Sequence, residues 1–320
     1  MPQNSKVKVL VTSAGTASAV SVIKALRQQE ELSLEIYATD MDPLAAGLYL
    51  ADHFFISPSA KNPSYIPSLI NFVKEKGIHA IIPIYSKEIS LIAKHSDELE
   101  KAGGKTFLPE ESVISTCNDK IAIAEILKRS GIKIPQHYSR PADVPPEKFP
   151  VFFKPNFSSS SSGAIAIENL TDLQKQFNAC PGGVIQELLK GQEITVDVFC
   201  NEASEAVVIA PRIRLAVKSG QTVKGETIDA SLFKNTVEKI CSLIKMKGAC
   251  NIQFFLSDNQ ITFLEINPRF AAGGLMLTVA AGANIPLLVL KQILGIKIKP
   301  EECKIKPGVK MTRYWEEIII

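Results

Sequence analysis

The sequence lacks the short motifs that mark several common classes of enzyme. It contains no GxxxxGK[ST] loop and no GxSxG turn, which excludes P-loop ATPases and serine hydrolases of the α/β type. The four histidines include no HExxH pair, and the six cysteines include no CxxC pair. Six scattered cysteines in a chain of 320 residues are typical of buried, reduced thiols rather than of a disulfide framework.

A strong charge of one sign and long apolar runs are missing as well. Lys and Arg number 36 against 33 Asp and Glu, a net charge of +3, and so small an excess argues against a dedicated nucleic-acid-binding protein. No apolar run approaches the ~20 residues that a membrane-spanning helix needs, and the polar first residues do not resemble a secretion signal. We therefore expect a cytoplasmic protein with no nucleic-acid or membrane partner.

The first hundred residues alternate between strand and helix patterns. Short apolar runs predict strands buried on both faces at residues 7–12, 34–38 and 80–84. Helical spacing is found at residues 19–28, 65–76 and 87–101. This alternation predicts a doubly wound parallel sheet, with a last strand at residues 105–108. The turn after the first strand keeps only Gly15 of the three glycines of a dinucleotide fingerprint, so no NAD site is expected.

After residue 112 the pattern changes from alternation to hairpins. A helix capped by Asn118 or Asp119 is expected to end at Gly131, and the proline-rich residues 141–150 predict a linker. Longer paired strands follow, with helices predicted at residues 230–245, 275–281 and 285–294. The predicted units are residues 1–112, 113–182 and 183–320, a mixture of α/β and α+β architecture.

A run of five serines occupies an unusual place between two short strands. Lys154 ends the first strand, and the serines lead to Gly163 and the second strand. A flexible linker is one interpretation. The other is a phosphate-binding loop, because small residues let backbone N–H groups approach phosphate oxygens and the lysine supplies a point charge.

The segment NIQFFLSDNQITFLEINPRF combines polar side chains with apolar strands. Glu265 and Asn267 are two residues apart, so they share a face. A tight turn at residues 258–259 brings Gln253 opposite Glu265, or one residue from it. Oxygen ligands of this kind suit Mg²⁺, and Arg269 lies on the same side. The alternative is a solvated edge hairpin.

Two further segments fit around this hairpin. The strand ending in Gln186 could present its backbone to an adenine edge, with Glu187 or Glu193 near a ribose; an ordinary hairpin with exposed glutamates is the alternative. Arg212 and Arg214 could hold a carboxylate or a phosphate, or could belong to a solvated basic strand.

Taken together and in this order, these segments resemble the ATP-grasp superfamily. The resemblance is greatest to the carbamoyl-phosphate-synthase large-subunit-like branch and related carboxylate–amine ligases. It covers nearly the whole chain, through VLVTSAG, NDK…LKRSGIKIP, FFKP, QELLKGQEITVDVF and EINPR. Each motif is weak alone, whereas five in order are specific. The resemblance implies a pre-ATP-grasp α/β domain followed by a two-subdomain ATP-grasp fold that clamps a nucleotide.

The resemblance also implies roles for individual residues. Arg269 and Lys154 are expected to be catalytic, and Glu265 to bridge two Mg²⁺ ions, with Mn²⁺ as an alternative. The expected ATP-binding residues are Lys120, Lys154, Ser158, Ser159, Ser160, Ser161, Ser162, Gly163, Gln186, Glu187, Leu188, Leu189 and Glu193. The expected metal ligands are Gln253, Glu265 and Asn267, and the expected substrate ligands are Arg212 and Arg214.

The activity implied is that of an EC 6.3-type ligase. Such an enzyme activates a small-molecule carboxylate as an acyl phosphate and joins it to an amine, releasing ADP and phosphate. A phosphotransferase that stops at an acyl or carbamoyl phosphate, and a non-catalytic ATP-binding module serving a partner protein, are the alternatives. The chain departs from many relatives in its serine loop and in its neutral Gln253. Relatives are often dimers, so a homodimer is one expected assembly.

Overall fold

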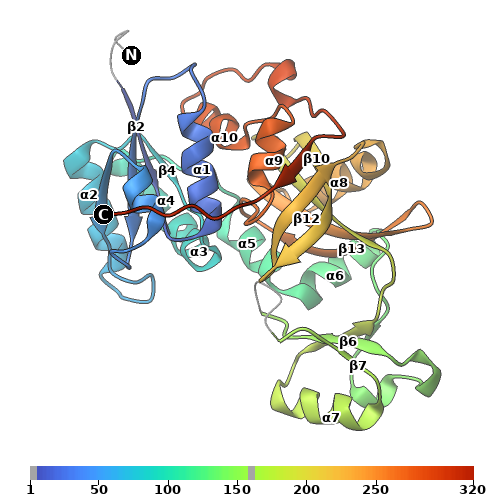
Figure 1. The fold of residues 1–320 in the computed structure, drawn as a ribbon. Coiled ribbons are helices and arrows are strands. Elements are labelled where there is room, and N and C mark those ends of the chain that lie inside the picture. Colours follow the sequence, from blue (N-terminus) through green and yellow to red (C-terminus); the bar gives the residue numbers. More distant parts are fainter. Residues whose placement is uncertain (1–5, 158–162) are drawn as a thin grey trace.

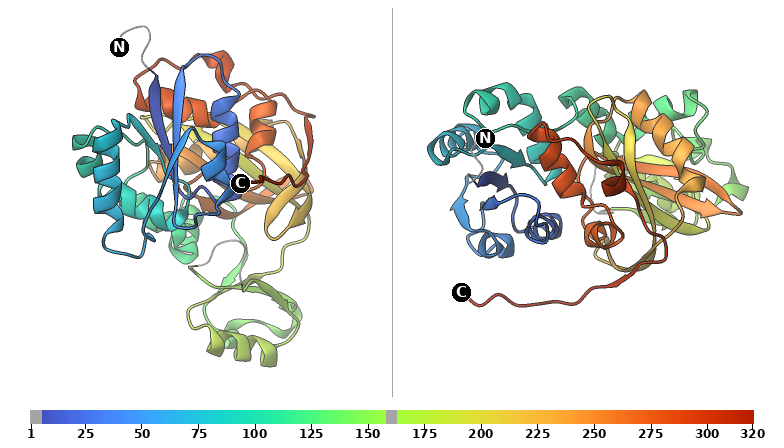
Figure 2. Two further views of the ribbon diagram at one scale, coloured as in Figure 1. Left: turned by 60° about the vertical axis from the view of Figure 1, so that its left-hand side comes forward. Right: turned by 90° about the horizontal axis from the view of Figure 1, so that it is seen from above.

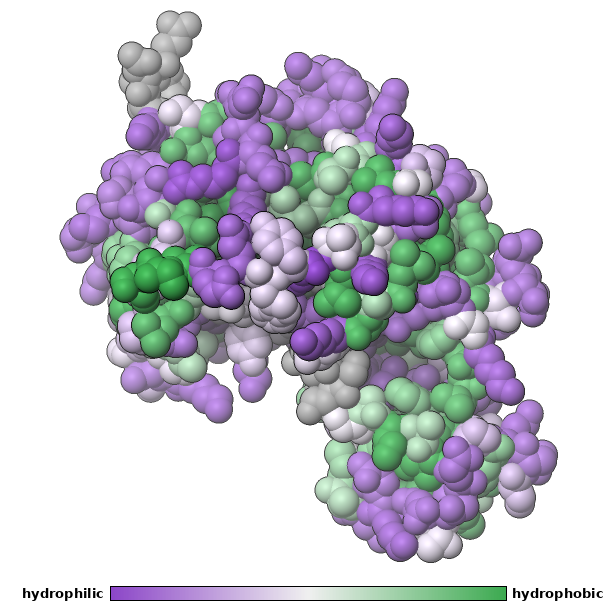
Figure 3. Space-filling view, viewed as in Figure 1, coloured by the Kyte–Doolittle hydropathy of each residue, from purple (hydrophilic) through white to green (hydrophobic). Residues whose placement is uncertain are grey.

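The computed structural model describes residues 6–157 and 163–320 of the chain. An N-terminal α/β part lies beside a large antiparallel sheet, and a small lobe projects from this body (Figure 1). The space-filling view shows a constriction between the lobe and the body (Figure 3). Among the described residues, no helix has both the length and the apolar character needed to cross a membrane.

The N-terminal part contains the predicted parallel sheet, in the order β3-β2-β1-β4. Its strands are β1 (Val7–Val11), β2 (Leu34–Asp40), β3 (His53–Ile56) and β4 (Ala80–Ile82). Its helices are α1 (Ala17–Arg27), the short η1 (Ala46–Leu50), α2 (Tyr65–Lys76), α3 (Ser86–Lys94) and α4 (Ser96–Lys101). Two local predictions are wrong. Residues 87–101 form two helices that meet at His95, and residues 105–108 contribute an isolated bridge from Lys105 to Ala80 rather than a strand.

The large sheet has the order β13-β12-β9-β10-β11-β14 and is antiparallel throughout. Its strands are β9 (Gln192–Cys200), β10 (Ala206–Lys218), β11 (Gln221–Thr227), β12 (Gly248–Ser257), β13 (Gln260–Asn267) and β14 (Lys310–Thr312). The helices around it are α5 (Glu111–Asn118), α6 (Lys120–Arg129), α8 (Ser231–Leu243), α9 (Leu275–Ala280), α10 (Ile285–Ile293) and the short η4 (Pro300–Cys303).

The N-terminal part and the large sheet share one apolar core. Val22 and Ile23 of α1 belong to the same buried cluster as Leu288 of α10 and as Phe199 and Val208 of the sheet. The views of Figure 2 show α1, α9 and α10 lying between the two sheets. Burial of so much apolar surface across the boundary holds these two parts together as one body.

The small lobe has a sheet and a core of its own. Its strands, in the order β5-β8-β6-β7, are β5 (His137–Tyr138), β6 (Val151–Lys154), β7 (Ile165–Ile167) and β8 (Val184–Glu187). Its helices are the short η2 (Pro141–Asp143) and η3 (Pro146–Lys148), and α7 (Leu170–Ala179). The linker prediction for residues 141–150 is wrong, because Val144 is buried in the lobe core with Phe153 and Leu173. The lobe sheet runs five residues past the predicted division after residue 182.

Candidate active site

The β12–β13 hairpin forms the centre of the candidate site. Asp258 and Asn259 both have positive φ angles, 50° and 58°, as in the tight turns that match the twist of a hairpin. The register places Gln253 directly opposite Glu265. The sequence predicted this pairing as one of two alternatives, and a register shift between Gln253 and Phe254 selects it.

The Glu265 carboxylate lies beside the side-chain amides of Asn267 and Asn251. Asn267 Nδ2 donates hydrogen bonds to Glu265 Oε1 (3.1 Å) and to Asn251 Oδ1 (3.3 Å). Asn251 is a member of this group that the sequence reasoning missed, although it precedes Gln253 by two residues and so shares its face. The result is one carboxylate among amide groups, a donor set that suits a hard divalent cation.

Arg269 links this group to the N-terminal part. Its Nε donates to Ser86 Oγ (3.0 Å) and its NH2 donates to Asn267 Oδ1 (3.3 Å). Burial lowers the pKa of Arg269, while the nearby Glu265 carboxylate opposes that shift. Ser86 lies 183 residues away in the chain, so no sequence pattern could have paired the two.

Two lysines approach Glu265 from different parts of the molecule. Lys154 ends β6 in the lobe and is 8% exposed. Burial lowers its pKa to about 8, with Glu265 opposing the shift and Lys120 adding to it. Lys120 opens α6 in the body, where Asp119 caps the helix, and its pKa is also lowered by burial. Two partly desolvated ammonium groups favour an anion between them.

A cavity of about 280 Å³ lies beside Lys154, between the lobe and the large sheet. Gln186, Leu188 and Leu189, three of the four residues expected to form an adenine hinge, line it. Gln186 is 3% exposed, and its Oε1 has no hydrogen-bond partner among the described residues. A buried acceptor without a donor is uncommon in native proteins, so this atom marks a place where a ligand donor fits.

The two glutamates considered for a ribose have different surroundings. Glu193 lines the same cavity and pairs with Arg214 on the neighbouring strand. Glu187 Oε1 instead accepts a hydrogen bond from the backbone N–H of Gln136 (2.9 Å). Of these two glutamates, Glu193 lines the cavity and Glu187 does not.

A smaller, polar cavity of about 80 Å³ lies on the other side of Gln253 and Glu265. Arg212 and Arg214 both line it. The Arg212 guanidinium is 2% exposed, with NH1 2.5 Å from Asp197 Oδ2 but too poorly aligned for a hydrogen bond. Among the described residues, Arg212 Nε has no hydrogen-bond partner. The Asp197 carboxylate therefore neutralises the charge of Arg212 but leaves Arg212 Nε and NH1 without a hydrogen bond among the described residues.

Gly274 leaves the space that the Arg212 side chain occupies. A Cβ built at Gly274 would lie 2.0 Å from Arg212 Nε. We expect Gly274→Ala to lower the free energy of unfolding by about 1–3 kcal/mol, measured by urea denaturation. The control is Gly182→Ala, where a Cβ meets nothing within 4 Å and only the positive φ of 78° opposes the change. Equal losses in the two variants would contradict the proposed contact.

A third cavity, of about 390 Å³, opens between the N-terminal part and the hairpin. Tyr85, Ser86 and Ser90 line it from the segment that follows β4, and Lys120 and Glu265 line it from the body. The order of the N-terminal sheet reverses between β1 and β4, and α/β sheets bind ligands beyond the carboxyl ends of strands at such a reversal. Glu265 lines all three cavities.

The predicted phosphate loop is described only in part. Ser158, Ser159, Ser160, Ser161 and Ser162 lie outside the described residues. Phe153 pairs with Ile165 across β6 and β7, so the two strands on either side of this segment form a hairpin. Gly163 has a φ of 75°, a conformation that favours glycine.

Two family models match separate parts of the chain. Residues 179–316 match the family described as ATP-grasp in the biosynthetic pathway with Ter operon, and residues 9–107 match the PylC-like N-terminal domain. The resemblance to the ATP-grasp superfamily inferred from the sequence is therefore confirmed over residues 179–316.

Individual relatives are more distant. The chain is 29% identical over 160 residues to the D-alanine–D-alanine ligase of Fusobacterium nucleatum, covering 47% of this chain and 55% of that protein. It is 21% identical over 313 residues to the arginine-specific carbamoyl phosphate synthase large chain of Bacillus subtilis, covering 91% and 28%. The chain thus spans about half the length, or less, of these relatives.

The fold agrees with these matches. A biotin carboxylase from Campylobacter jejuni in complex with β-γ-ATP superimposes with a TM-score of 0.73 at 17% identity, over 94% of this chain and 74% of that one. At this level of identity the likeness establishes the fold. The predicted combination of a parallel N-terminal sheet and an ATP-grasp fold is confirmed.

Proposed function

We propose that this protein is an ATP- and Mg²⁺-dependent ligase that activates a small-molecule carboxylate as an acyl phosphate and joins it to an amine. The observation that carries the proposal is the convergence of three cavities on Glu265. A reaction in which ATP, an acid and an amine react in turn needs binding sites that open onto one position, because the reacting atoms of all three must lie within a few ångströms of each other. The ligases among the relatives support the same reading.

ATP fits the cavity of about 280 Å³ between the lobe and the sheet. The adenine would lie against Leu188 and Leu189, and its amino group would donate to the buried Gln186 Oε1. Lys154 and Lys120 would hold the phosphates, whose negative charge would compensate both ammonium groups for the hydration that they lose by burial. The serine loop would close the phosphate side. The complex of the structurally similar biotin carboxylase with β-γ-ATP supports nucleotide binding by this fold.

Glu265, Asn267 and Gln253 are the residues that would hold Mg²⁺. Their oxygens form the kind of donor set this ion takes, one or two carboxylates completed by substrate phosphates. Bound there, the ion would supply charge neutralisation on the phosphoryl oxygens. Asn251 lies close enough to Asn267 to fix its amide (3.3 Å) and acts as a positioning residue. Mn²⁺ would fit the same oxygens.

The acid would occupy the polar cavity of about 80 Å³. Arg212 and Arg214 would orient its carboxylate, one oxygen of which attacks the γ-phosphorus while the bond to the ADP oxygen breaks. Arg269, held by Ser86 and Asn267, would stabilise the charge on the transferring group. The amine then attacks the acyl carbon, phosphate leaves with the bonding electrons, and the amine loses a proton.

The amine would enter through the third cavity, beneath α3. We expect Ser90→Phe to narrow this cavity and to raise the KM for the amine at least about tenfold while leaving the KM for ATP unchanged. Steady-state kinetics with each substrate varied in turn measures both constants. The control is Ser130→Phe, at the far end of α6 from Lys120. A matching rise in the KM for ATP would show that the third cavity is not a separate subsite.

A screen of product formation tests the proposed reaction. Purified protein is incubated with ATP, Mg²⁺ and a panel of amino acids and dicarboxylates, with and without added amine, and phosphate and products are measured. A new amide together with ADP supports the ligase. An acyl phosphate trapped by hydroxylamine, with no amide from any amine, would indicate the phosphotransferase. ATP binding without ADP release across the panel would indicate a binding module.

We propose the cytoplasm as the location and a homodimer as the assembly. All six cysteines are free thiols in the structure, as a reducing compartment requires. Size-exclusion chromatography with light scattering tests the assembly directly.

A further inference from the structure

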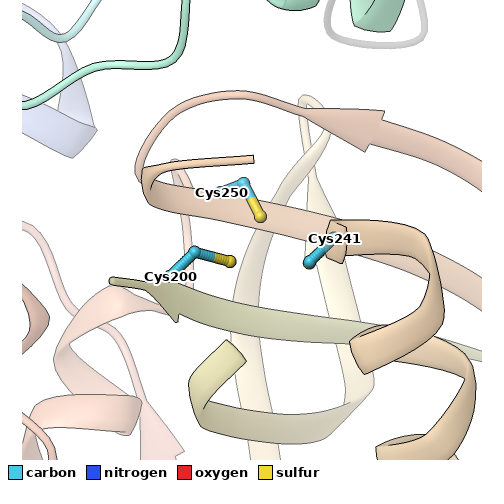
Figure 4. Close-up of side chains that lie close together, drawn as sticks. All are labelled: Cys200, Cys241 and Cys250. Atoms are coloured by element: carbon cyan, nitrogen blue, oxygen red, sulfur yellow. The ribbon is translucent and has the colours of Figure 1, made fainter. Parts of the chain in front are cut away.

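Three cysteines converge on the face of the large sheet that lies opposite the candidate active site. Cys200 ends β9, Cys250 lies on the adjacent β12, and Cys241 comes from α8, which covers this face (Figure 4). Their sulfur atoms all lie within 4.8 Å of one another. Because side chains alternate along a strand, Cys250 points away from the face that carries Asn251.

The sulfur positions are close to those of a metal thiolate site. A metal–sulfur bond of about 2.3 Å sets sulfur–sulfur distances of about 3.8–4.0 Å. The sulfur atoms of a pyramidal trivalent complex are closer still, at about 3.5 Å, so the cluster would have to contract by about 1 Å or slightly more to bind one. The three residues are 0–2% exposed, so water is not available to complete a larger coordination shell.

The surroundings of the cluster favour an ion whose complex has no net charge. Cys200, Cys241 and Cys250 belong to an apolar core with Val198 and Ile252. Hydrogen bonds from the thiols of Cys241 and Cys250 lower the pKa of Cys200. The same hydrogen bonds with Cys200, together with burial, raise the pKa of Cys241 and of Cys250. An uncompensated charge in such a core is costly.

We infer that Cys200, Cys241 and Cys250 form a binding site for a trivalent, thiol-seeking metal or metalloid ion of the arsenite type. Soft thiolate ligands select soft ions, and three thiolates around a trivalent ion make a neutral complex. A divalent ion would leave one negative charge in the core and a monovalent ion two. Arsenite itself is neutral when protonated, As(OH)₃. Each thiol forms an As–S bond and its proton leaves with a hydroxide as water, so three waters are released without any oxidant.

The cluster lies near one end of the sheet. Cys200 is the last residue of β9, and the next residues, 201–205, form a turn in which Glu202 and Ala203 are exposed. Opening of this turn would expose the sulfur atoms without separating β9 from β12. Local opening of this size costs less than global unfolding, so loading of the folded protein is feasible.

Arsenite binding to the purified full chain tests the site. We expect one arsenic per chain after gel filtration, measured by mass spectrometry of the element, and protection of three of the six thiols from Ellman's reagent in denaturant. Cys241→Ala and Cys250→Ala are each expected to weaken arsenite binding at least about tenfold. Cys180→Ala and Cys303→Ala, at the two half-buried cysteines, are expected to bind as the wild type does.

Four outcomes would contradict the proposed site. Two are an arsenite affinity that is unchanged in both cluster variants, and thiol protection that is lost in Cys180→Ala or Cys303→Ala instead. The other two are the absence of stoichiometric arsenite binding, and unfolding of the wild type by arsenite. Near-UV circular dichroism checks the fold of each variant, and Cys241→Val keeps the core filled if the alanine variant unfolds. Parallel titrations with Cd²⁺ and Cu⁺ test the charge argument, which is contradicted if either ion binds more tightly than arsenite.

Discussion

Replacement of Glu265 with alanine is expected to lower ADP release by about 100- to 1,000-fold while the fold remains intact. Glu265 is the only proposed metal ligand that carries a charge, and it lines all three cavities. Its removal leaves Lys120, Lys154 and Arg269 without the carboxylate whose negative charge they share. The lost stabilisation of the transferring phosphoryl group is of the size found when one such electrostatic partner is removed.

Single-turnover and steady-state assays of ADP release measure this effect. The matched control is Glu238→Ala, on the exposed side of α8, which should retain wild-type turnover. Glu265→Asp keeps the charge but shortens the side chain, and an intermediate rate is expected. Retained turnover in Glu265→Ala would refute the proposed mechanism, including the metal site.

The second large effect concerns Lys154, for which activity and stability are expected to change in opposite directions. Lys154→Met should reduce turnover by about 100-fold or more, because the ammonium contacts the phosphates in the proposed complex. The same change should raise the free energy of unfolding at pH 7 by about 3 kcal/mol, since burial lowers the pKa of Lys154 to about 8 from its ordinary value of 10.5.

The pH dependence gives the sign of this effect. Below pH 8 the lysine is protonated in both folded and unfolded chains, so the full cost of the buried charge is present. Between pH 8 and pH 10.5 the unfolded chain keeps the proton and the folded chain loses it, so the wild type gains stability as the pH rises. The advantage of Lys154→Met should therefore shrink across this window.

Urea denaturation at pH 7 and at pH 9.5 measures both free energies. Lys175→Met is the control in the same lobe, because its side chain is 73% exposed and should show neither effect. The buried-charge interpretation would be contradicted if Lys154→Met had no larger free energy of unfolding than the wild type at pH 7. It would also be contradicted if the difference stayed constant from pH 7 to pH 9.5.

Local patterns predicted much of the site because its centre is a single hairpin. Counting outward from the turn at residues 258–259 brings Gln253 opposite Leu264, one residue from Glu265, and only the register shift between Gln253 and Phe254 moves the pairing to Glu265. Alternation put Asn267 on the same face as Glu265. The strand and turn signals of the N-terminal sheet were local in the same way, and the helix from Tyr65 to Lys76 was predicted to the residue.

Contacts between distant segments could not be predicted from spacing. The Arg269–Ser86 hydrogen bond joins residues 183 positions apart, and the Arg212–Asp197 pair depends on the register of β9 with β10. The cysteines appeared scattered because spacing along the chain says nothing about adjacent strands and a covering helix. The proline-rich residues suggested a linker, since composition cannot show that Val144 fills the core of the lobe.

The separation of the apolar cores divides the candidate site between two rigid bodies. Lys154 and Gln186 are attached to the lobe core, whereas Glu265, Arg269 and Lys120 are attached to the body. Rotation of the lobe about its two connecting segments would break neither core. It would break the hydrogen bonds that join Asn156 to Asp119 and to the first turn of α6. Such a rotation would move Lys154 and Gln186 together, away from Glu265. Nucleotide exchange would then proceed by a change in the angle between two bodies, with each half of the site keeping its internal geometry.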